Sequence, residues 1–283
     1  ISSSGDLTAN AGNIGGAVTN AGDLILTGGT LSKSVSGAGL TTITGNTTNS
    51  AGINQGVKVN SGITLTNNAA LGSASGSVTN AGTINSSADN IKGTVSNTGS
   101  LNLSGGTLSK AVSGSGKTTI TGNTTNSGGI NQGVTVNSGV TLTNNAALGS
   151  DSGTITNSGT INTSASNIKG AVTNNNTVNL SGGTLSKAIS GSGTTNITGI
   201  VSSNSAISQA ISIASAGDLT ISASNVGGNV TNAGDLILNG GTLSKSVTGS
   251  GKTSITGAVT ANSAISPVSY THLRAHETEL HLV

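Results

Sequence analysis

Apolar and polar residues alternate along most of the chain, and short polar turns interrupt the alternation at regular intervals. A typical stretch places Val18, Asn20, Gly22, Leu24 and Leu26 in the order Val-x-Asn-x-Gly-x-Leu-x-Leu. A period of two predicts β-strands that bury one face. Asn and Gly tolerate left-handed backbone angles, so each Asn-x-Gly predicts a tight turn between two strands.

Long repeats are superimposed on this short pattern. The string Gly-Gly-Thr-Leu-Ser-Lys begins at Gly28, Gly105, Gly182 and Gly240, so the spacings in the numbering are 77, 77 and 58. The last spacing is shorter than the others by about a quarter of the long repeat. Loss of one whole short unit is typical of a solenoid, because the coils on either side of the missing one can still stack.

A short unit of this kind cannot bury its own apolar face, but a stack of such units forms a continuous narrow core. We therefore expect an all-β chain, a right-handed parallel β-helix (β-solenoid) of about 13–14 coils, with about four coils in each long repeat. Equivalent side chains would then stack on one another. Asn20, Asn80 and Asn97 are expected to form an amide ladder along one corner.

Composition supports a thin core rather than a globular one. The chain has 45 Gly, one Tyr and no Trp, Phe, Met or Cys, so Val, Ile, Leu, Ala and Thr must supply the core. Residues 1–266 contain no Pro, which fits a backbone paired throughout and argues against a disordered chain. A net charge of +2 gives no reason to expect nucleic-acid binding. No apolar run approaches the ~20 residues of a membrane span, and no signal peptide is visible.

The C-terminal segment follows a different pattern. Thr198 to Gln209 is echoed from Thr256 onwards, but the counterpart of Gln209 is Pro267. Residues 267–283 contain the chain's only Pro, Tyr and Arg and all three of its His residues. They resemble one reading frame of a transposon-end adapter used in DNA library preparation. We therefore divide the chain into a solenoid fragment, 1–266, and a non-native tail, 267–283.

This division removes a candidate site from consideration. His272, His276 and Glu277 would otherwise suggest a metal or acid–base cluster. The ionisable side chains of residues 1–266 are Lys and Asp alone. Four Asp residues lie in Gly-Asp-Leu turns, where local hydrogen bonds explain them, and Asp89 and Asp151 have no acidic neighbour in sequence. We predict no catalytic, cofactor-binding or metal-binding residues and no enzymatic activity.

The longer coils suggest where a ligand would bind. Segments 47–56, 124–133 and 201–210 are expected to bulge as one recurring loop. Binding residues are often found on loops of a rigid scaffold. The predicted ligand-binding residues are therefore Asn54 and Gln55 with their counterparts Asn131 and Gln132, and the expected partner is a host-surface glycan or protein.

The Val-x-Asn-x-Gly-x-Leu-x-Leu strands, the Ser/Thr/Asn/Gly bias and the lack of Cys resemble the passenger region of type V secreted proteins, the autotransporter and filamentous adhesin group. The resemblance covers residues 1–266. It implies a structural shaft of a bacterial adhesin, at the outer-membrane surface or secreted, with an export signal and an outer-membrane translocator barrel beyond this fragment.

Two alternatives remain open. The first is a fragment of a solenoid glycan-active enzyme whose catalytic coils lie elsewhere, since such enzymes cluster carboxylates on adjacent coils. The second is an ice-binding solenoid, suggested by strands such as Thr64-Leu65-Thr66. Its threonine array, which includes Thr41-Thr42-Ile43-Thr44, is interrupted, because the neighbouring coils have Leu24 and Leu26, or Leu101 and Leu103, at the corresponding positions.

Overall fold

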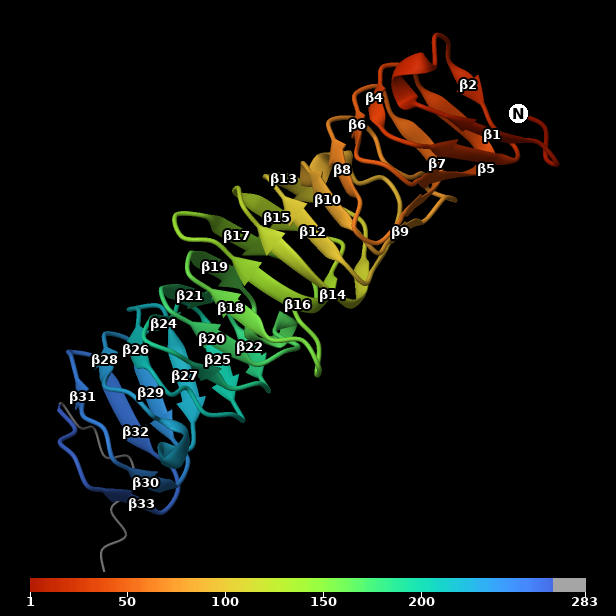
Figure 1. The fold of residues 1–283 in the computed structure, drawn as a ribbon. Coiled ribbons are helices and arrows are strands. Elements are labelled where there is room, and N and C mark those ends of the chain that lie inside the picture. The colour runs from red at the N-terminus through yellow and green to blue at the C-terminus, as the bar shows by residue number, and fades with distance from the viewer. Residues whose placement is uncertain (267–283) are drawn as a thin grey trace, which may run out of the picture.

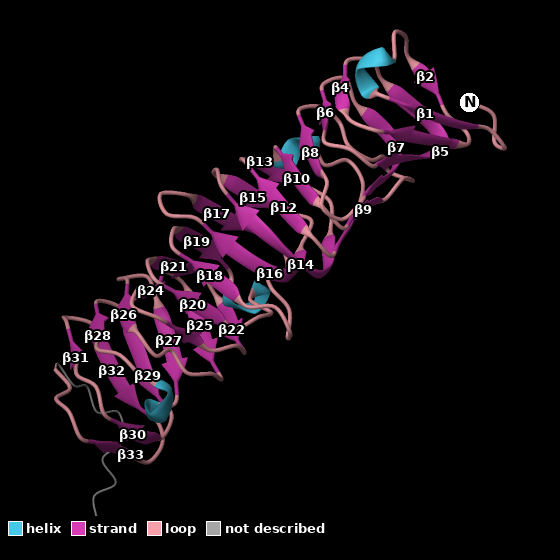
Figure 2. Cartoon of the chain, in the orientation of Figure 1, coloured by secondary structure: helices cyan, strands magenta, loops and turns pink. Residues whose placement is uncertain are grey.

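Each coil has three short extended segments, so the stack of coils has three sides. The structure is a computed structural model that describes residues 1–266, and Figures 1 and 2 show these residues as an elongated rod. The fold is all-β, with parallel strands stacked as a β-solenoid of about 15 coils. At ~4.8 Å per coil the rod is roughly 70 Å long. The predicted solenoid is confirmed with slightly more coils than expected, and its right-handed winding stays a prediction.

Four strands bend around a corner and contribute to two sides: β5 (Val35–Ile43), β7 (Ile53–Val59), β14 (Val112–Ile120) and β16 (Ile130–Val136). The other strands of side one are β1 (Asp6–Ala9), β3 (Asp23–Leu26), β9 (Val78–Asn80), β11 (Val95–Asn97), β22 (Gly183–Leu185), β25 (Ile200–Ser203), β27 (Asp218–Ile221), β29 (Asp235–Leu238) and β32 (Lys252–Ile255).

Side two is formed by β4 (Gly29–Leu31), β6 (Thr47–Asn49), β8 (Thr64–Asn67), β10 (Thr83–Ser86), β12 (Ser100–Leu103), β18 (Ile155–Asn157), β20 (Val172–Asn174), β23 (Ile189–Ser190), β30 (Gly241–Leu243) and β33 (Val259–Ala261). Side three is formed by β2 (Val18–Thr19), β13 (Gly106–Leu108), β15 (Thr124–Asn126), β17 (Thr141–Asn144), β19 (Thr160–Thr163), β21 (Thr177–Leu180), β24 (Thr194–Ile197), β26 (Ala210–Ile213), β28 (Val230–Asn232) and β31 (Val247–Thr248).

Four single-turn 3₁₀ helices lie among the strands: η1 (Ala11–Asn13), η2 (Ala88–Asn90), η3 (Ala165–Asn167) and η4 (Ala223–Asn225). Each begins with a buried Ala that joins the core. The η3 turn lies on side one, since Ile168 bridges Leu148 there and η3 packs against β22 in the next coil. The helices thus occupy strand positions in the stack without interrupting it.

The predicted alternation is present in the strands. In β3, Leu24 and Leu26 are fully buried while Ile25 between them is half-exposed. Val35 and Val95 are buried and Val18 is partly buried against the same core, as the sequence predicts. Stacking brings one layer of aliphatic side chains onto the next, so neighbouring coils supply both strand partners and core contacts.

Successive long repeats do not occupy the same side. Leu24 lies on side one, whereas Leu101, its counterpart one long repeat later, lies on side two. From Leu24 to Leu101 the chain moves thirteen times from one side of the rod to the next, and three such moves complete one coil. The long repeat therefore spans four and one third coils instead of the four expected, and each repeat is rotated by one side relative to the previous one.

The predicted amide ladder forms as pairs of buried Asn side chains. Asn80 Nδ2 donates to Asn97 Oδ1 at 2.7 Å, and the same bond joins Asn157 to Asn174 one repeat later. Asn20 is buried too, but its Nδ2 donates to the Leu40 carbonyl instead. The expectation is thus confirmed for Asn80 and Asn97, whereas Asn20 ends outside the ladder.

Candidate functional site

The four residues predicted to bind a ligand do not form a common site. Gln55 and Gln132 are each 1% exposed, because their side chains enter the core. Their prediction as ligand contacts is therefore wrong. Asn54 and Asn131 are exposed, but Asn54 lies on side three and Asn131 on side one. Binding at these two residues stays a prediction for two separate places.

The expected bulging loops are also absent at those positions. Segment 47–56 contains β6 and the start of β7, segment 124–133 contains β15 and the start of β16, and segment 201–210 begins inside β25. The extra residues of the long coils lie instead at 72–77 and 149–154, where short hydrogen-bonded turns leave the stack. The alternation of strand residues already indicated this outcome, because Ile53, Gln55 and Val57 lie at every second position and therefore face the same way.

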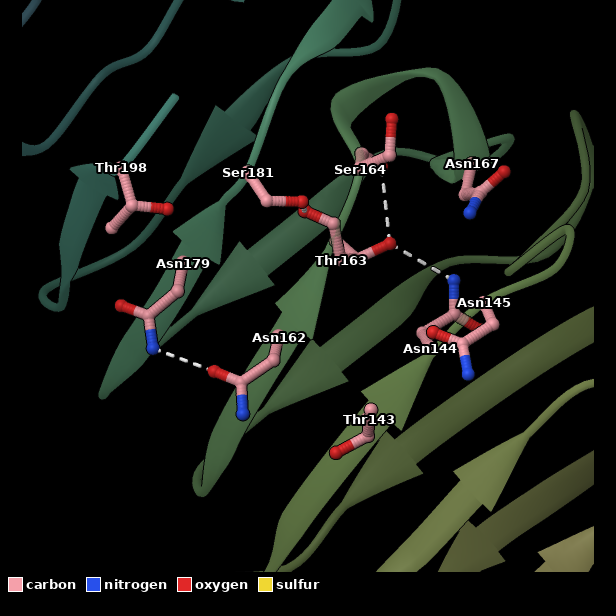
Figure 3. Close-up of a pocket in the computed structure, with 10 residues that line it drawn as sticks. All are labelled: Thr143, Asn144, Asn145, Asn162, Thr163, Ser164, Asn167, Asn179, Ser181 and Thr198. Carbon is pink, nitrogen blue, oxygen red and sulfur yellow. Dashed lines mark hydrogen bonds between the residues drawn. The ribbon is translucent and has the colours of Figure 1, made fainter. Parts of the chain in front are cut away.

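A polar groove lies at the corner between sides three and one (Figure 3). Its lining residues are all Thr, Asn or Ser: Thr143, Asn144, Asn145, Asn162, Thr163, Ser164, Asn167, Asn179, Ser181 and Thr198. They come from β17, β19, β21, the turn at η3 and the residues that follow β17, β21 and β24. We call this set the side-three groove.

Two layers of hydrogen bonds organise the side-three groove. In the buried layer, Asn126 Nδ2 donates to Asn144 Oδ1 at 2.6 Å, and Asn144 Nδ2 donates to Thr163 Oγ1 at 3.0 Å. In the outer layer, Asn196 Nδ2 donates to Asn179 Oδ1 at 2.8 Å, and Asn179 Nδ2 donates to Asn162 Oδ1 at 2.7 Å. The outer amides thus point the same way in three consecutive coils.

A second groove repeats the first at a distance of one long repeat. It is lined by Thr66, Asn67, Asn68, Asn85, Ser86, Ser87, Asn102, Ser104 and Thr121, each of which corresponds to a lining residue of the side-three groove. Because the long repeat is rotated by one side, this side-two groove follows β10 and β12. Its outer ladder is shorter, with Asn102 Nδ2 donating to Asn85 Oδ1 at 2.8 Å.

The sequence indicates these grooves at its outward-facing positions, whereas the interrupted threonine array concerns inward-facing ones. Thr41 and Leu24 stack on each other as inward residues, so their mismatch says nothing about the surface. The outward row on side three runs from Thr143 through Asn162, Asn179 and Asn196. This row has no apolar interruption, and strings such as Thr-Ile-Asn-Thr and Thr-Val-Asn-Leu indicate it.

Acidic residues meet at two places on side one. Asp6 lies opposite Asp23 in the neighbouring coil, and Asp218 lies opposite Asp235, which is followed in turn by Lys252. Local hydrogen bonding in turns, the role predicted for these Asp residues, does not require them to stack on one another. Among residues 1–266 no group of three or more His, Cys, Asp or Glu is close enough to hold a metal ion. The His272, His276 and Glu277 cluster lies outside the described residues.

One ion pair fastens an exposed loop to the rod. Lys187 Nζ donates to Asp151 Oδ1 from two coils further along the chain. The Asp151 side chain is 89% exposed at the tip of the 149–154 loop. The hydrogen bond from Lys187, together with its positive charge, holds the pKa of the Asp151 carboxyl below its usual range. Asp151 therefore has a partner in space that its sequence neighbours do not reveal.

No helix within the described residues is long and apolar enough to span a bilayer. No family model, curated protein or solved structure matches the chain.

Proposed function

We propose that the chain is a passive structural shaft from a bacterial surface or secreted adhesin, which holds a binding region away from the cell. The main support is the modular repeat. The last repeat is the short one, and it spans three and one third coils, from Gly183 on side one to Gly241 on side two. A full repeat spans one coil more, and both kinds of repeat end one side further on than they began. One whole coil is absent, yet β28 still pairs with β31 and β29 with β32.

Tolerance of a missing coil fits a protein in which length and stiffness matter more than the position of any one residue. The missing coil is the one that contains the protruding loop at 149–154 in the previous repeat. The adhesin role, the outer-membrane or secreted location and the translocator follow from the resemblance of the repeats, and they belong to the proposal.

Electron microscopy of chains of different repeat number tests the shaft. Duplicating residues 105–181 adds four and one third coils, so the rod should lengthen by roughly 21 Å without a bend. A flexible or unchanged outline would contradict the proposal. For the adhesin role, the rod displayed between a cell anchor and a reference binding domain should raise capture of a bulky partner as repeats are added, whereas length-independent capture would count against it.

The stacked carboxylates of side one favour testing the enzymatic alternative in parallel. Two carboxylates on adjacent coils are the minimum that glycosidic hydrolysis requires. Incubation with polysaccharides and measurement of new reducing ends decides between the two, with the Asp218→Asn and Asp235→Asn double variant as control. Release of reducing ends that the double variant abolishes would replace the shaft by an enzyme.

A further inference from the structure

Two parallel rows of half-exposed polar side chains run along side three. The first row contains Thr141, Thr160, Thr177 and Thr194, paired in register through β17, β19, β21 and β24. The second row is Thr143 with Asn162, Asn179 and Asn196, two positions further along the same strands. Each row repeats at the ~4.8 Å spacing of neighbouring strands. The corner residues Ser164 and Asn167 border the second row and give the surface the shape of a trough, which includes the side-three groove.

The side chains of the trough keep hydrogen-bond donors and acceptors that are free to bind a ligand. Asn179 uses one N–H on Asn162 and one oxygen lone pair on Asn196. An Asn side chain has two N–H donors and two acceptor lone pairs, so one donor and one acceptor remain for solvent or a ligand. Ser181 and Thr198 donate their hydroxyl hydrogens to backbone carbonyls, which leaves their oxygens as acceptors. The trough therefore presents paired donors and acceptors at regular steps along the rod.

A ligand for this trough must be neutral and rich in hydroxyl groups. None of the ten lining residues is ionisable, so the trough offers no charge to an anionic or cationic polymer. Its apolar surface comes from the carbon atoms of Thr, Asn and Ser side chains, and no Val, Leu or Ile side chain lines it. A hydroxyl both donates and accepts, which is the combination that each outer amide leaves free.

We infer that the side-three groove binds a neutral, hydroxyl-rich polysaccharide chain, which lies along the outer ladder of Asn162 and Asn179 and continues onto Asn196 in the next coil. The inference goes beyond the shaft role and rests on the groove itself, so it stands or falls separately. Because the site has no aromatic platform, each contact is weak and affinity comes from repetition along the polymer.

The side-two groove supplies an internal comparison. It keeps Asn85 and Asn102, but the next residues of its two rows are Lys117 and Thr119, where the rows of side three have Thr194 and Asn196. A charge and a shorter ladder make this copy the poorer site for a neutral chain. Removing its amides should therefore affect binding less than removing those of side three.

Native affinity electrophoresis of the whole chain in gels cast with galactomannan, glucomannan or dextran tests the inference, with alginate as the anionic comparison. We expect at least one neutral polymer to retard the chain equally at low and high salt. The triple variant Asn162→Thr, Asn179→Thr and Asn196→Thr should weaken the retardation about tenfold or more, since about three hydrogen bonds are lost. Thr143 already occupies the same row, so the fold should tolerate these changes.

The matched control is Asn85→Thr with Asn102→Thr, which should reduce retardation by a smaller factor. Retardation by alginate alone, by no neutral polymer, or undiminished in a folded triple variant would overturn the inference. Two other occupants give distinct results that would also overturn it. Thermal hysteresis lost in the triple variant would assign the face to ice, and a dimer in sedimentation velocity lost in that variant would assign it to a second copy of the chain.

Discussion

The Gln132 amide lies 2.7 Å from the hydroxyl of Thr118 inside the solenoid core. The amide orientation that satisfies every partner also pairs it with Asn97, whose Nδ2 donates to Gln132 Oε1 at 2.9 Å. The Gln132 side chain thus joins three consecutive coils. Thr41 with Gln55 and Thr195 with Gln209 repeat the contact at the same separation in sequence.

Removing the Gln132 amide alone should destabilise the rod more than removing the Gln132 amide and the Thr118 hydroxyl together. Gln132→Leu leaves the buried Thr118 hydroxyl without a partner, which costs about 1–3 kcal/mol. Adding Thr118→Val removes the orphaned hydroxyl and should recover part of that loss, since the Asn97 amide still lacks the Gln132 oxygen. Urea unfolding of the single and double variants measures both effects, and equal stabilities for Gln132→Leu and the double variant would contradict the assignment.

The fourth Thr of this series, Thr253, shows what happens without the amide. Its Oγ1 is buried and has no hydrogen-bond partner among the described residues. The residue at the same separation from Thr253 is Pro267, which lies outside the described residues and occupies the position of Gln209 in the repeat. Pro267→Gln should therefore slow hydrogen exchange in the last coil and stabilise the chain by about 1 kcal/mol or more.

Two threonine variants control for this effect. Thr253→Val removes a hydroxyl that has no partner within residues 1–266 and should stabilise the chain, whereas Thr195→Val removes a satisfied one and should destabilise it. If Pro267→Gln acted equally in the wild-type and Thr253→Val backgrounds, its effect would not come from this contact.

Strand alternation and turn glycines were enough to predict the solenoid, because a period of two decides which side chains face the core. They could not predict the rotation of the long repeat by one side. Strands β5 and β7 bend around a corner without a break, so counting turns underestimates the number of sides. The polar grooves were missed for a related reason, since inward Thr41 was compared where outward Thr42 mattered.

Buried and exposed Asn ladders should differ in energetic importance. Asn157 is fully buried, and its amide bonds both Asn174 and the Thr177 carbonyl. Asn157→Ala therefore leaves buried polar groups unpaired and should cost about 1–3 kcal/mol. Asn179→Ala, on the half-exposed outer ladder, should cost well under about 1 kcal/mol because water replaces the lost partner. Thermal unfolding compares the two, and a similar cost for both would contradict the burial argument.

The Asp151–Lys187 ion pair predicts a local pH dependence. The pKa of Asp151 is depressed, so the contribution of the pair is present above the unfolded carboxyl value of ~3.9 and is lost as the pH falls through the lower folded value. NMR titration should show the Asp151 pKa returning to its ordinary value in Lys187→Met. The counterparts one repeat earlier are Ala74 and Lys110, so Ala74→Asp should create a second depressed carboxyl. An ordinary pKa for the introduced carboxyl would show that the loop geometry is not repeated.

Deleting one coil in register should leave the rod intact. Residues 141–159 comprise β17, the segment with Leu148 and its loop, and β18, which is one position on each of the three sides. Their removal joins Val140 to Thr160, the junction that the last repeat already has at Gly217 and Asp218. This whole-coil deletion variant should unfold cooperatively, with a denaturant m-value lower in proportion to the lost surface. Removing residues 141–150 instead takes away about half a coil and shifts inward residues off the core, so this variant should aggregate or unfold. Equal behaviour of the two deletions would show that stacking register does not control the stability of the rod.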